Sequence, residues 1–232
     1  MQVVILAGGM GTRMGEETYR IPKPMIKIGE LPILYHIMKY YSYYGHIEFL
    51  ILGGYKYEVI EEYCNGLGNN WKTKVIDTGL ETLTGSRILK AYDHIKFPTM
   101  LTYGDGLSNI DLNALWMHHT LAKKRVTISG VHPPGRFGTL KIENGEIVDF
   151  NEKKRLESEW VNGGFMVLEE STYKYIKPNE MLEFKTLPRL LEFNELNVYL
   201  HEGWWYPMDT QRDKTELETL WRETFCPWRK DE

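Results

Sequence analysis

Several features that define large classes of protein are scarce or absent in this sequence. It contains only two cysteines, Cys64 and Cys226, far apart and without C-x-x-C spacing, so we expect neither a disulfide framework nor a zinc knuckle. No apolar run approaches the length of a membrane-spanning helix, and the apolar start is too short for a signal peptide. These absences predict a soluble, cytoplasmic protein with reduced cysteines and no membrane partner.

An excess of positive charge is also missing. The 232 residues carry a formal net charge of −4, and no basic excess extends over the whole chain, so we expect no nucleic-acid partner. Hydrophobic residues make up 42% of the chain, which is enough for a substantial core and suits one large domain. The 15 tyrosines and 7 tryptophans fit a core, a ligand groove or a subunit interface.

Two well-known phosphate-binding loops are absent as well. A P-loop requires G-x-x-x-x-G-K-[ST], and no glycine of this chain is followed by Lys-Ser or Lys-Thr. The dinucleotide motif G-x-G-x-x-G begins at Gly9 and Gly11, but its third position is Met14. The prolines at 22 and 24 argue against a clear helix after it. A phosphate site at this end of the chain must therefore be of another kind.

The sequence does contain a glycine-rich loop after its first strand. The apolar run at 3–7 leads into Gly8-Gly9-Met10-Gly11-Thr12-Arg13, and Lys23 follows between two prolines. Glycines leave backbone N–H groups unshielded at the end of a strand, where they can bind phosphate oxygens. Arg13 and Lys23 add positive charge. The segment predicts a polyphosphate site, and the alternative is a tight turn with no ligand.

Hydrophobic patterning predicts an α/β protein with a mixed, mainly parallel central sheet flanked by helices. In residues 1–125 we expect strands at 3–7, 47–52, 73–76 and 100–103 and helices at 33–44, 55–63, 84–94 and 112–122, with Thr84 and Asp111 as N-caps. In residues 126–232 we expect strands at 126–131, 139–142, 146–150, 161–168 and 197–200 and helices at 182–193 and 212–224. The later strands predict a mixed sheet beside the first. No linker is evident, so we expect a single domain over 1–232.

Two aspartates follow strand-like runs. Asp105 lies between glycines just past the strand that ends at Tyr103, at the carboxyl edge of the sheet, where open α/β folds bind ligands. Such a carboxylate suits Mg²⁺, although an ordinary Asp-Gly turn is equally consistent. Asp209 follows an aromatic run and precedes a helix. It is either an N-cap or a second metal ligand, and the second role requires that it face Asp105.

The middle of the chain carries three further motifs. They are Pro133-Pro134-Gly135-Arg136-Phe137-Gly138, Glu152-Lys153 and Asn162-Gly163-Gly164-Phe165. A lysine can neutralise a phosphate as a point charge, and an asparagine beside two glycines offers donors for hydroxyl groups. Each motif alone is typical of a turn. Their order along the chain is what indicates a site.

Together, LAGGMGTR, PKPM, YGDG, PPGRFG, the Glu152-Lys153 pair, NGGF and WYPMDT resemble the motifs of the sugar-1-phosphate nucleotidylyltransferases, and within them the glucose-1-phosphate cytidylyltransferases. The resemblance covers nearly the whole chain. It implies a Rossmann-like nucleotidyltransferase fold with a nucleotide-binding half at 1–125 and a sugar-phosphate-binding half at 126–232. It also implies a Mg²⁺-dependent, homo-oligomeric enzyme of surface polysaccharide biosynthesis. The reaction would condense CTP with a sugar 1-phosphate, α-D-glucose 1-phosphate by best match, to give a CDP-sugar and pyrophosphate.

The same resemblance implies roles for individual residues. Arg13 and Lys23 would be catalytic and contact the phosphates, and Asp105 and Asp209 would bind Mg²⁺. The residues expected to bind the nucleotide are Leu6, Ala7, Gly8, Gly9, Gly11, Thr12, Arg13, Lys23, Thr84, Arg87 and Gly104. The residues expected to bind the sugar phosphate are Tyr103, Gly138, Glu152, Lys153, Asn162 and Gly163.

The chain departs from the family pattern at two points. The family motif E-K-P is Glu152-Lys153-Lys154 here, so that Lys154 can compete with Lys153 for the phosphate. The segment 64–71 is shorter than the insertion that family members usually carry there, which contributes to subunit contacts. The identity of the acceptor and the oligomeric state therefore stay open. The alternatives are a different triphosphate or acceptor, or a non-catalytic protein that binds a nucleotide sugar.

Overall fold

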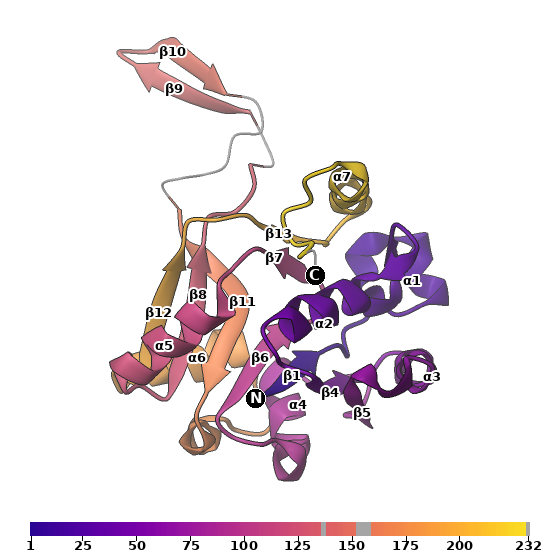
Figure 1. Ribbon diagram of the computed structural model, residues 1–232. Helices are drawn as coiled ribbons and strands as arrows, with labels where there is room; N and C mark the ends of the chain where they lie inside the picture. The colour runs from indigo at the N-terminus through magenta and orange to yellow at the C-terminus, as the bar shows by residue number, and fades with distance from the viewer. Residues whose placement is uncertain (136–137, 152–158, 231–232) are drawn as a thin grey trace.

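A seven-stranded sheet forms the centre of the computed structural model, which describes residues 1–135, 138–151 and 159–230 (Figure 1). The strand order is β12-β8-β11-β6-β1-β4-β5. The strands are β1 (Gln2–Leu6), β4 (Glu48–Gly53), β5 (Lys72–Asp77), β6 (Thr99–Tyr103), β8 (Val126–Val131), β11 (Val161–Leu168) and β12 (Leu196–His201). β11 runs antiparallel to both of its neighbours, and the other neighbouring pairs are parallel. The expected mixed, mainly parallel sheet is confirmed.

Helices cover both faces of this sheet. The helices are α1 (Glu16–Arg20), α2 (Ile33–Tyr43), α3 (Tyr57–Asn65), α4 (Thr84–Lys90), α5 (Leu112–Ala122), α6 (Leu187–Glu192) and α7 (Gln211–Arg222). Val3 and Ile5 of β1 belong to a core with side chains of α2, α3, α5 and α7, whereas Val4 belongs to a second core with α4 and α6. Successive strand residues point to opposite faces, so a strand buried on both sides needs the unbroken apolar run that opens the chain.

The parallel strands bring three loops to one edge of the sheet. Leu6 at the end of β1 lies opposite Leu52 of β4 and Tyr103 of β6. The segments that follow these three strands therefore start side by side at their carboxyl ends. The glycine-rich loop and Asp105 belong to two of these segments.

The second half of the chain extends this sheet instead of building another beside it, so the expectation of a separate mixed sheet was wrong. β11 pairs with β6, with Met166 opposite Leu101, and then with β8 on its other side. Two strands of this half, β9 (Thr139–Glu143) and β10 (Glu146–Asn151), form a ribbon that projects from the top of the molecule in Figure 1. Both Asn144 and Gly145 have positive φ at its turn (51° and 86°), as a tight hairpin of matching twist requires.

Short elements near the loops were not expected from the sequence. A five-residue helix, α1, does follow the glycine-rich loop. β2 (Lys27–Ile28) pairs with β3 (Leu31–Pro32), and β7 (Gly106–Ser108) pairs with β13 (Trp205–Pro207). Strands of two or three residues carry no readable periodicity, because the alternation of burial needs a longer run to appear.

One of the two expected helix caps is confirmed and the other was wrong. Asp111 accepts hydrogen bonds from the N–H groups of Asn113 (2.9 Å) and Ala114 (3.0 Å), as an N-cap of α5. Thr84 is instead the first residue of α4, which ends at Lys90, and a separate 3₁₀ turn follows at Tyr92–His94. Its hydroxyl instead forms hydrogen bonds with Leu182 and Glu183.

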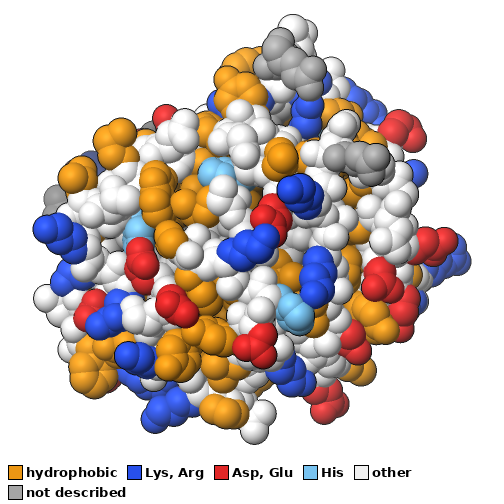
Figure 2. Space-filling model, turned by 60° about the horizontal axis from the view of Figure 1, so that its bottom comes forward, with side chains coloured by type: hydrophobic (Ala, Val, Ile, Leu, Met, Phe, Trp, Pro, Cys, Tyr) orange, Lys and Arg blue, Asp and Glu red, His pale blue; other side chains and the backbone are white. Residues whose placement is uncertain are grey.

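The surface view of Figure 2 shows side chains of both charge signs interspersed, with hydrophobic side chains in small groups between them. Neither sign dominates this face, in accord with the small net charge of −4. Both cysteines are buried. Within the described ranges, no helix combines the length and the apolar character needed to cross a membrane.

Candidate active site

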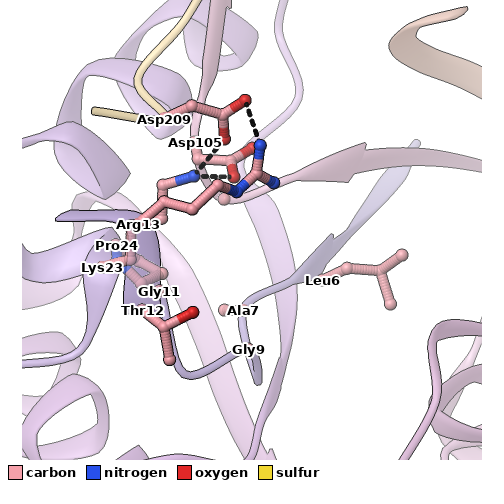
Figure 3. A pocket seen from close by; sticks show the side chains of 11 residues that line it. Leu6, Ala7, Gly9, Gly11, Thr12, Arg13, Lys23, Pro24, Asp105 and Asp209 are labelled. Atoms are coloured by element: carbon pink, nitrogen blue, oxygen red, sulfur yellow. Dashed lines mark hydrogen bonds and ion pairs between the residues drawn. The ribbon is translucent and has the colours of Figure 1, made fainter. Parts of the chain in front are cut away.

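The glycine-rich loop forms one wall of a cavity of about 230 Å³ at the carboxyl edge of the sheet (Figure 3). Segments far apart in the sequence line it: Leu6, Ala7, Gly9, Gly11, Thr12, Arg13, Lys23, Pro24, Gly104, Asp105 and Asp209. Figure 3 shows the side chains of Arg13 and Lys23 reaching toward the two aspartates, while Leu6 points away from them. The cavity therefore combines unshielded backbone with two cations and two carboxylates.

The loop itself keeps its N–H groups available. Gly11 has φ 63°, a left-handed conformation that costs glycine little. A side chain at Gly9 would meet no atom within 4 Å, so the backbone faces open space there. In the described part of the chain, no protein acceptor takes the N–H groups of Gly9, Gly11 or Thr12. Such a loop can donate to an anion without first giving up a bond within the protein.

A small antiparallel pair brings the two aspartates together. β7 begins directly after Asp105 and pairs with β13, with Gly106 opposite Pro207. The N–H of Met208 then donates to the carbonyl of Asp105 at 2.8 Å. Asp209, one residue further on, therefore lies beside Asp105. The condition that the sequence left open, that Asp209 face Asp105, is met.

Lys23 bridges the two carboxylates. Its Nζ donates to Oδ2 of Asp105 at 2.6 Å and to Oδ1 of Asp209 at 2.8 Å. Burial by itself lowers the pKa of Lys23, but the charges of Asp105 and Asp209 and the hydrogen bonds to them together raise it above its ordinary value. The side chain is only 11% exposed. Lys23 is therefore a fixed, protonated cation in the wall of the cavity.

Arg13 is a cation of a different kind. Its Nη1 donates to Oδ2 of Asp209 at 3.3 Å, and its side chain is 71% exposed. Ion pairs of exposed side chains contribute little and exchange readily with other partners. Arg13 can therefore leave Asp209 for a phosphate at small cost, whereas Lys23 is held by two bonds.

Asp209 does not cap the helix that follows, because the next residue does. Thr210 is the N-cap of α7, and Asp213 completes a capping box with it. Oδ2 of Asp213 also accepts the N–H of Asp209 at 3.0 Å and that of Thr210 at 2.8 Å. Asp213 is 5% exposed and holds the backbone that carries Asp209. The spacing Thr-x-x-Asp could have indicated this role from the sequence.

The two carboxylates fit a magnesium ion. Both lie within bonding distance of one Nζ atom, so both can reach one cation. Among the described residues, no group of three or more His, Cys, Asp or Glu side chains could hold a metal. A site with two carboxylates leaves its remaining positions to phosphate and water oxygens, which is the arrangement that Mg²⁺ prefers.

Three of the residues expected to bind the nucleotide do not line the cavity: Gly8, Thr84 and Arg87. The guanidinium of Arg87 is 4% exposed and donates to the carbonyls of Gly8, Gly53 and Gly79, each at 2.9 Å. It thus lies behind the loop and ties together the segments that follow β1, β4 and β5. Burial lowers the pKa of Arg87.

The described residues expected on the acceptor side, which are Tyr103, Gly138, Asn162 and Gly163, do not line this cavity. The hydroxyl of Tyr103 donates to Glu183, and Oδ1 of Asn162 accepts the N–H of Gly164 at 3.0 Å. The carbonyl of Gly163 accepts the indole N–H of Trp205 at 2.8 Å. Gly138 is exposed beside the β9–β10 ribbon. Glu152, Lys153, Lys154, Arg136 and Phe137 lie outside the described residues.

The fold and the cavity together define a class of protein, an α/β protein that can hold a polyphosphate and a divalent cation where its strands end. Residues 2–213 match a family model whose description is "Nucleotidyl transferase". The chain therefore belongs to the nucleotidyl transferase family, and its likeness to the glucose-1-phosphate cytidylyltransferases extends over its full length.

Two relatives carry this likeness. The chain is 39% identical over 254 positions to the glucose-1-phosphate cytidylyltransferase of Salmonella typhi, with 99% of each chain covered. It is 40% identical over 253 positions to the probable glucose-1-phosphate cytidylyltransferase of Bacillus subtilis (strain 168), again with 99% of each covered. Both alignments are longer than the 232 residues of this chain, so the relatives have positions with no counterpart here.

A solved structure supports the fold. The chain is similar to the crystal structure of HddC from Yersinia pseudotuberculosis complexed with GMP-PN, with a TM-score of 0.76 and 24% identity. The similarity covers 95% of this chain and 99% of the other. At this level of identity, the likeness concerns the arrangement of the backbone.

Proposed function

We propose that this protein is a Mg²⁺-dependent cytidylyltransferase. It condenses CTP with a sugar 1-phosphate, first of all α-D-glucose 1-phosphate, to give a CDP-sugar and pyrophosphate. The observation that carries the proposal is the Lys23 bridge between Asp105 and Asp209 beside a loop with available N–H groups. The full-length likeness to the Salmonella typhi enzyme supports the choice of substrates. A cytoplasmic location, a role in surface polysaccharide biosynthesis and a homo-oligomeric state belong to the same proposal.

The reaction needs positioning and charge neutralisation more than covalent chemistry. A phosphate oxygen of the sugar 1-phosphate attacks the α-phosphorus of CTP. The bond from the α-phosphorus to the oxygen bridging to the β-phosphorus breaks, and pyrophosphate leaves with that electron pair. Substitution at phosphorus of this kind is accelerated mainly by holding the two reactants in line and by stabilising the negative charge.

The residues of the cavity divide this work. The N–H groups of Gly9 and Gly11 and the mobile charge of Arg13 hold the triphosphate. Asp105 and Asp209 hold Mg²⁺, which when bound neutralises charge on the phosphate oxygens. Lys23 lies in the wall of the same cavity, where its cation would face the phosphates of CTP.

A second candidate is a nucleotidylyltransferase that uses another triphosphate or another phosphorylated acceptor. The chain is 30% identical over 188 positions to the D-glycero-alpha-D-manno-heptose 1-phosphate guanylyltransferase of Campylobacter jejuni, covering 80% of this chain and 83% of that protein. A non-catalytic protein that binds a nucleotide sugar is disfavoured, because a pure binder has no need for two carboxylates opposed across one lysine.

Pyrophosphate release is the measurement that tests the proposal. The purified protein is incubated with CTP, UTP, GTP, ATP or dTTP, each against a panel of sugar 1-phosphates, with Mg²⁺ or with EDTA. We expect the highest kcat/KM for CTP with α-D-glucose 1-phosphate, and loss of activity with EDTA. A better rate with another pair supports the second candidate. No turnover with any pair, together with tight nucleotide-sugar binding, overturns both.

A further inference from the structure

Glu183 takes no part in the cavity, yet its carboxylate is fixed beside the acceptor-side residues. It belongs to a single π-helical turn, Leu182–Thr186, that leads into α6. Such turns are rare and often occur at functional sites. Glu183 itself is half-buried. Nothing in the periodicity of the sequence marks it.

Each oxygen of this carboxylate accepts a hydrogen bond from one hydroxyl group. The hydroxyl of Tyr103 donates to Oε1 at 2.5 Å, and the hydroxyl of Thr84 donates to Oε2 at 2.6 Å. Thr84 is fixed in this direction because its oxygen accepts the N–H of Leu182 at 2.9 Å. In the described part of the chain, neither oxygen forms an ion pair with lysine, arginine or histidine. A carboxylate has about four acceptor positions, so two hydrogen bonds leave room for others.

Tyr103 connects this carboxylate to the proposed acceptor residues. A side chain on Gly164 would come within 2.4 Å of the Tyr103 ring, so the Asn162-Gly163-Gly164 segment packs directly against it. Burial, and then the negative charge of Glu183, raises the pKa of Tyr103 well above its ordinary value, so this hydroxyl stays a neutral donor. Tyr103 is the last residue of β6, and Asp105 of the cavity follows two residues later, so both groups are attached to the end of the same strand.

We propose that Glu183 determines the specificity for the acceptor by accepting a hydrogen bond from a ring hydroxyl of the sugar 1-phosphate. This inference rests on the proposed function. Sugar hydroxyls are donors, and a fixed carboxylate with unused lone pairs and no cation beside it is a strong acceptor for them. A site built to bind a hydroxyl discriminates sharply against an analogue that lacks it, because the buried acceptor is then left unpaired.

The test combines variants of Glu183 with analogues of the acceptor. The kcat/KM is measured with CTP and α-D-glucose 1-phosphate and with its 2-, 3-, 4- and 6-deoxy analogues, for the wild type and for Glu183→Gln and Glu183→Ala. We expect both variants to lower kcat/KM with glucose 1-phosphate about 10- to 100-fold. With one deoxy analogue, wild type and variants should agree within about threefold, while the KM for CTP stays unchanged. Glu192→Gln, an exposed glutamate of α6, is the matched control and should behave as wild type.

Each other outcome has a defined meaning. If the variants lose the same factor with every analogue, Glu183 only supports the structure and the inference is wrong. Unchanged kinetics in both variants overturn it too. Melting temperatures show whether a variant is folded, and Glu183→Asp, which keeps the charge but shortens the side chain, replaces any variant that is not. If the wild type turns over no sugar 1-phosphate at all, the proposed function fails and this inference fails with it.

Discussion

The two sides of the site are built from different interactions. On the nucleotide side, Lys23, Arg13, Asp105 and Asp209 form a cluster of charges beside a loop of available N–H groups. On the acceptor side, the hydroxyls of Tyr103 and Thr84 donate to the carboxylate of Glu183, and the amide oxygen of Asn162 accepts the N–H of Gly164. The first arrangement suits a ligand of high charge, and the second suits a ligand with many hydroxyls.

In the proposed reaction, this difference predicts that the nucleotide side provides rate and the acceptor side provides selectivity. Charges act over several ångströms and neutralise any triphosphate, so they lower the barrier without choosing strongly among nucleotides. Hydrogen bonds depend on the position of each donor and acceptor, so they separate one sugar from another. Changes on the nucleotide side should therefore affect every acceptor alike. Changes on the acceptor side should depend on the acceptor.

The largest effect is expected from Asp105→Asn. The change removes one of two carboxylates for Mg²⁺ and one partner of Lys23, so kcat should fall about 1,000-fold or more with every acceptor. Pyrophosphate release as a function of Mg²⁺ concentration is the measurement. Asp93→Asn, at an exposed aspartate, is the control and should leave the rate unchanged. A near-normal rate for Asp105→Asn would refute the metal assignment.

Lys23→Met should have the next largest effect. It removes a cation beside the α-phosphorus and leaves two neighbouring carboxylates that repel each other, so kcat should fall about 100- to 1,000-fold. In the same variant, Mg²⁺ should raise the melting temperature more than in the wild type, because the ion takes over the neutralisation of both aspartates. An equal Mg²⁺ response in both proteins would contradict the shared site.

Asp213→Ala should reduce activity about tenfold, although Asp213 itself is not proposed to contact Mg²⁺ or a substrate. The change removes the acceptor for the N–H groups of Asp209 and Thr210 and part of the cap of α7, which also costs about 1 kcal/mol of stability. We expect half-maximal activity to require a higher Mg²⁺ concentration, and we expect a lower melting temperature. The variant Asp213→Asn, which keeps one acceptor oxygen, should recover most of both. If Asp213→Ala destabilised the fold but kept full activity, Asp213 would have no role in positioning Asp209.

Tyr103→Phe should produce a smaller and one-sided change. The ring and its packing against Gly164 remain, but Oε1 of Glu183 loses its donor. We expect the KM for glucose 1-phosphate to rise about three- to tenfold and the KM for CTP to stay the same. Initial rates with each substrate varied in turn measure this split. A similar rise in the KM for CTP would show that the acceptor side also contributes to binding of the nucleotide.

The smallest effect concerns stability at high pH. The folded state raises the pKa of Lys23, so its contribution to stability is fully present below the pKa of lysine in the unfolded chain. It is lost as pH rises through the higher pKa of the folded state. Denaturant unfolding of the wild type at a series of pH values above 8 should show this alkaline loss, and Lys23→Met should show a smaller one. A loss of equal size in Lys23→Met would assign it to other groups.

The sequence supported much of the fold, and its errors have clear causes. β1 and β6 are short apolar runs bounded by glycine, so their positions could be predicted. The pairing of β11 with β6 could not be predicted, because the sequence of a strand does not specify which other strand it will pair with. Thr84 had the chemistry of an N-cap, but Leu182 and Glu183, nearly a hundred residues away, take its hydroxyl instead. Local propensity was overridden by a distant partner.

For the candidate site, recognition of the loop and of Asp105 came from local pattern, since each glycine or aspartate directly follows a strand. The expected roles of the loop residues and of Lys23, Asp105 and Asp209 stay predictions until variants are measured. The contacts of Arg87 could not be predicted from local pattern. The resemblance suggested a residue that binds the nucleotide, and only the structure reveals the backbone carbonyls to which it donates.

The sequence by itself determined that this chain would place a glycine-rich loop and a carboxylate at the end of buried strands, since these features depend on neighbours in the chain. It also determined the family, through motifs that span nearly the whole length. Only the tertiary structure decided that Lys23 would lie between Asp105 and Asp209, which are 82 and 186 residues away from it. Contacts over such separations depend on strand pairing and packing of the whole molecule. No local pattern encodes them.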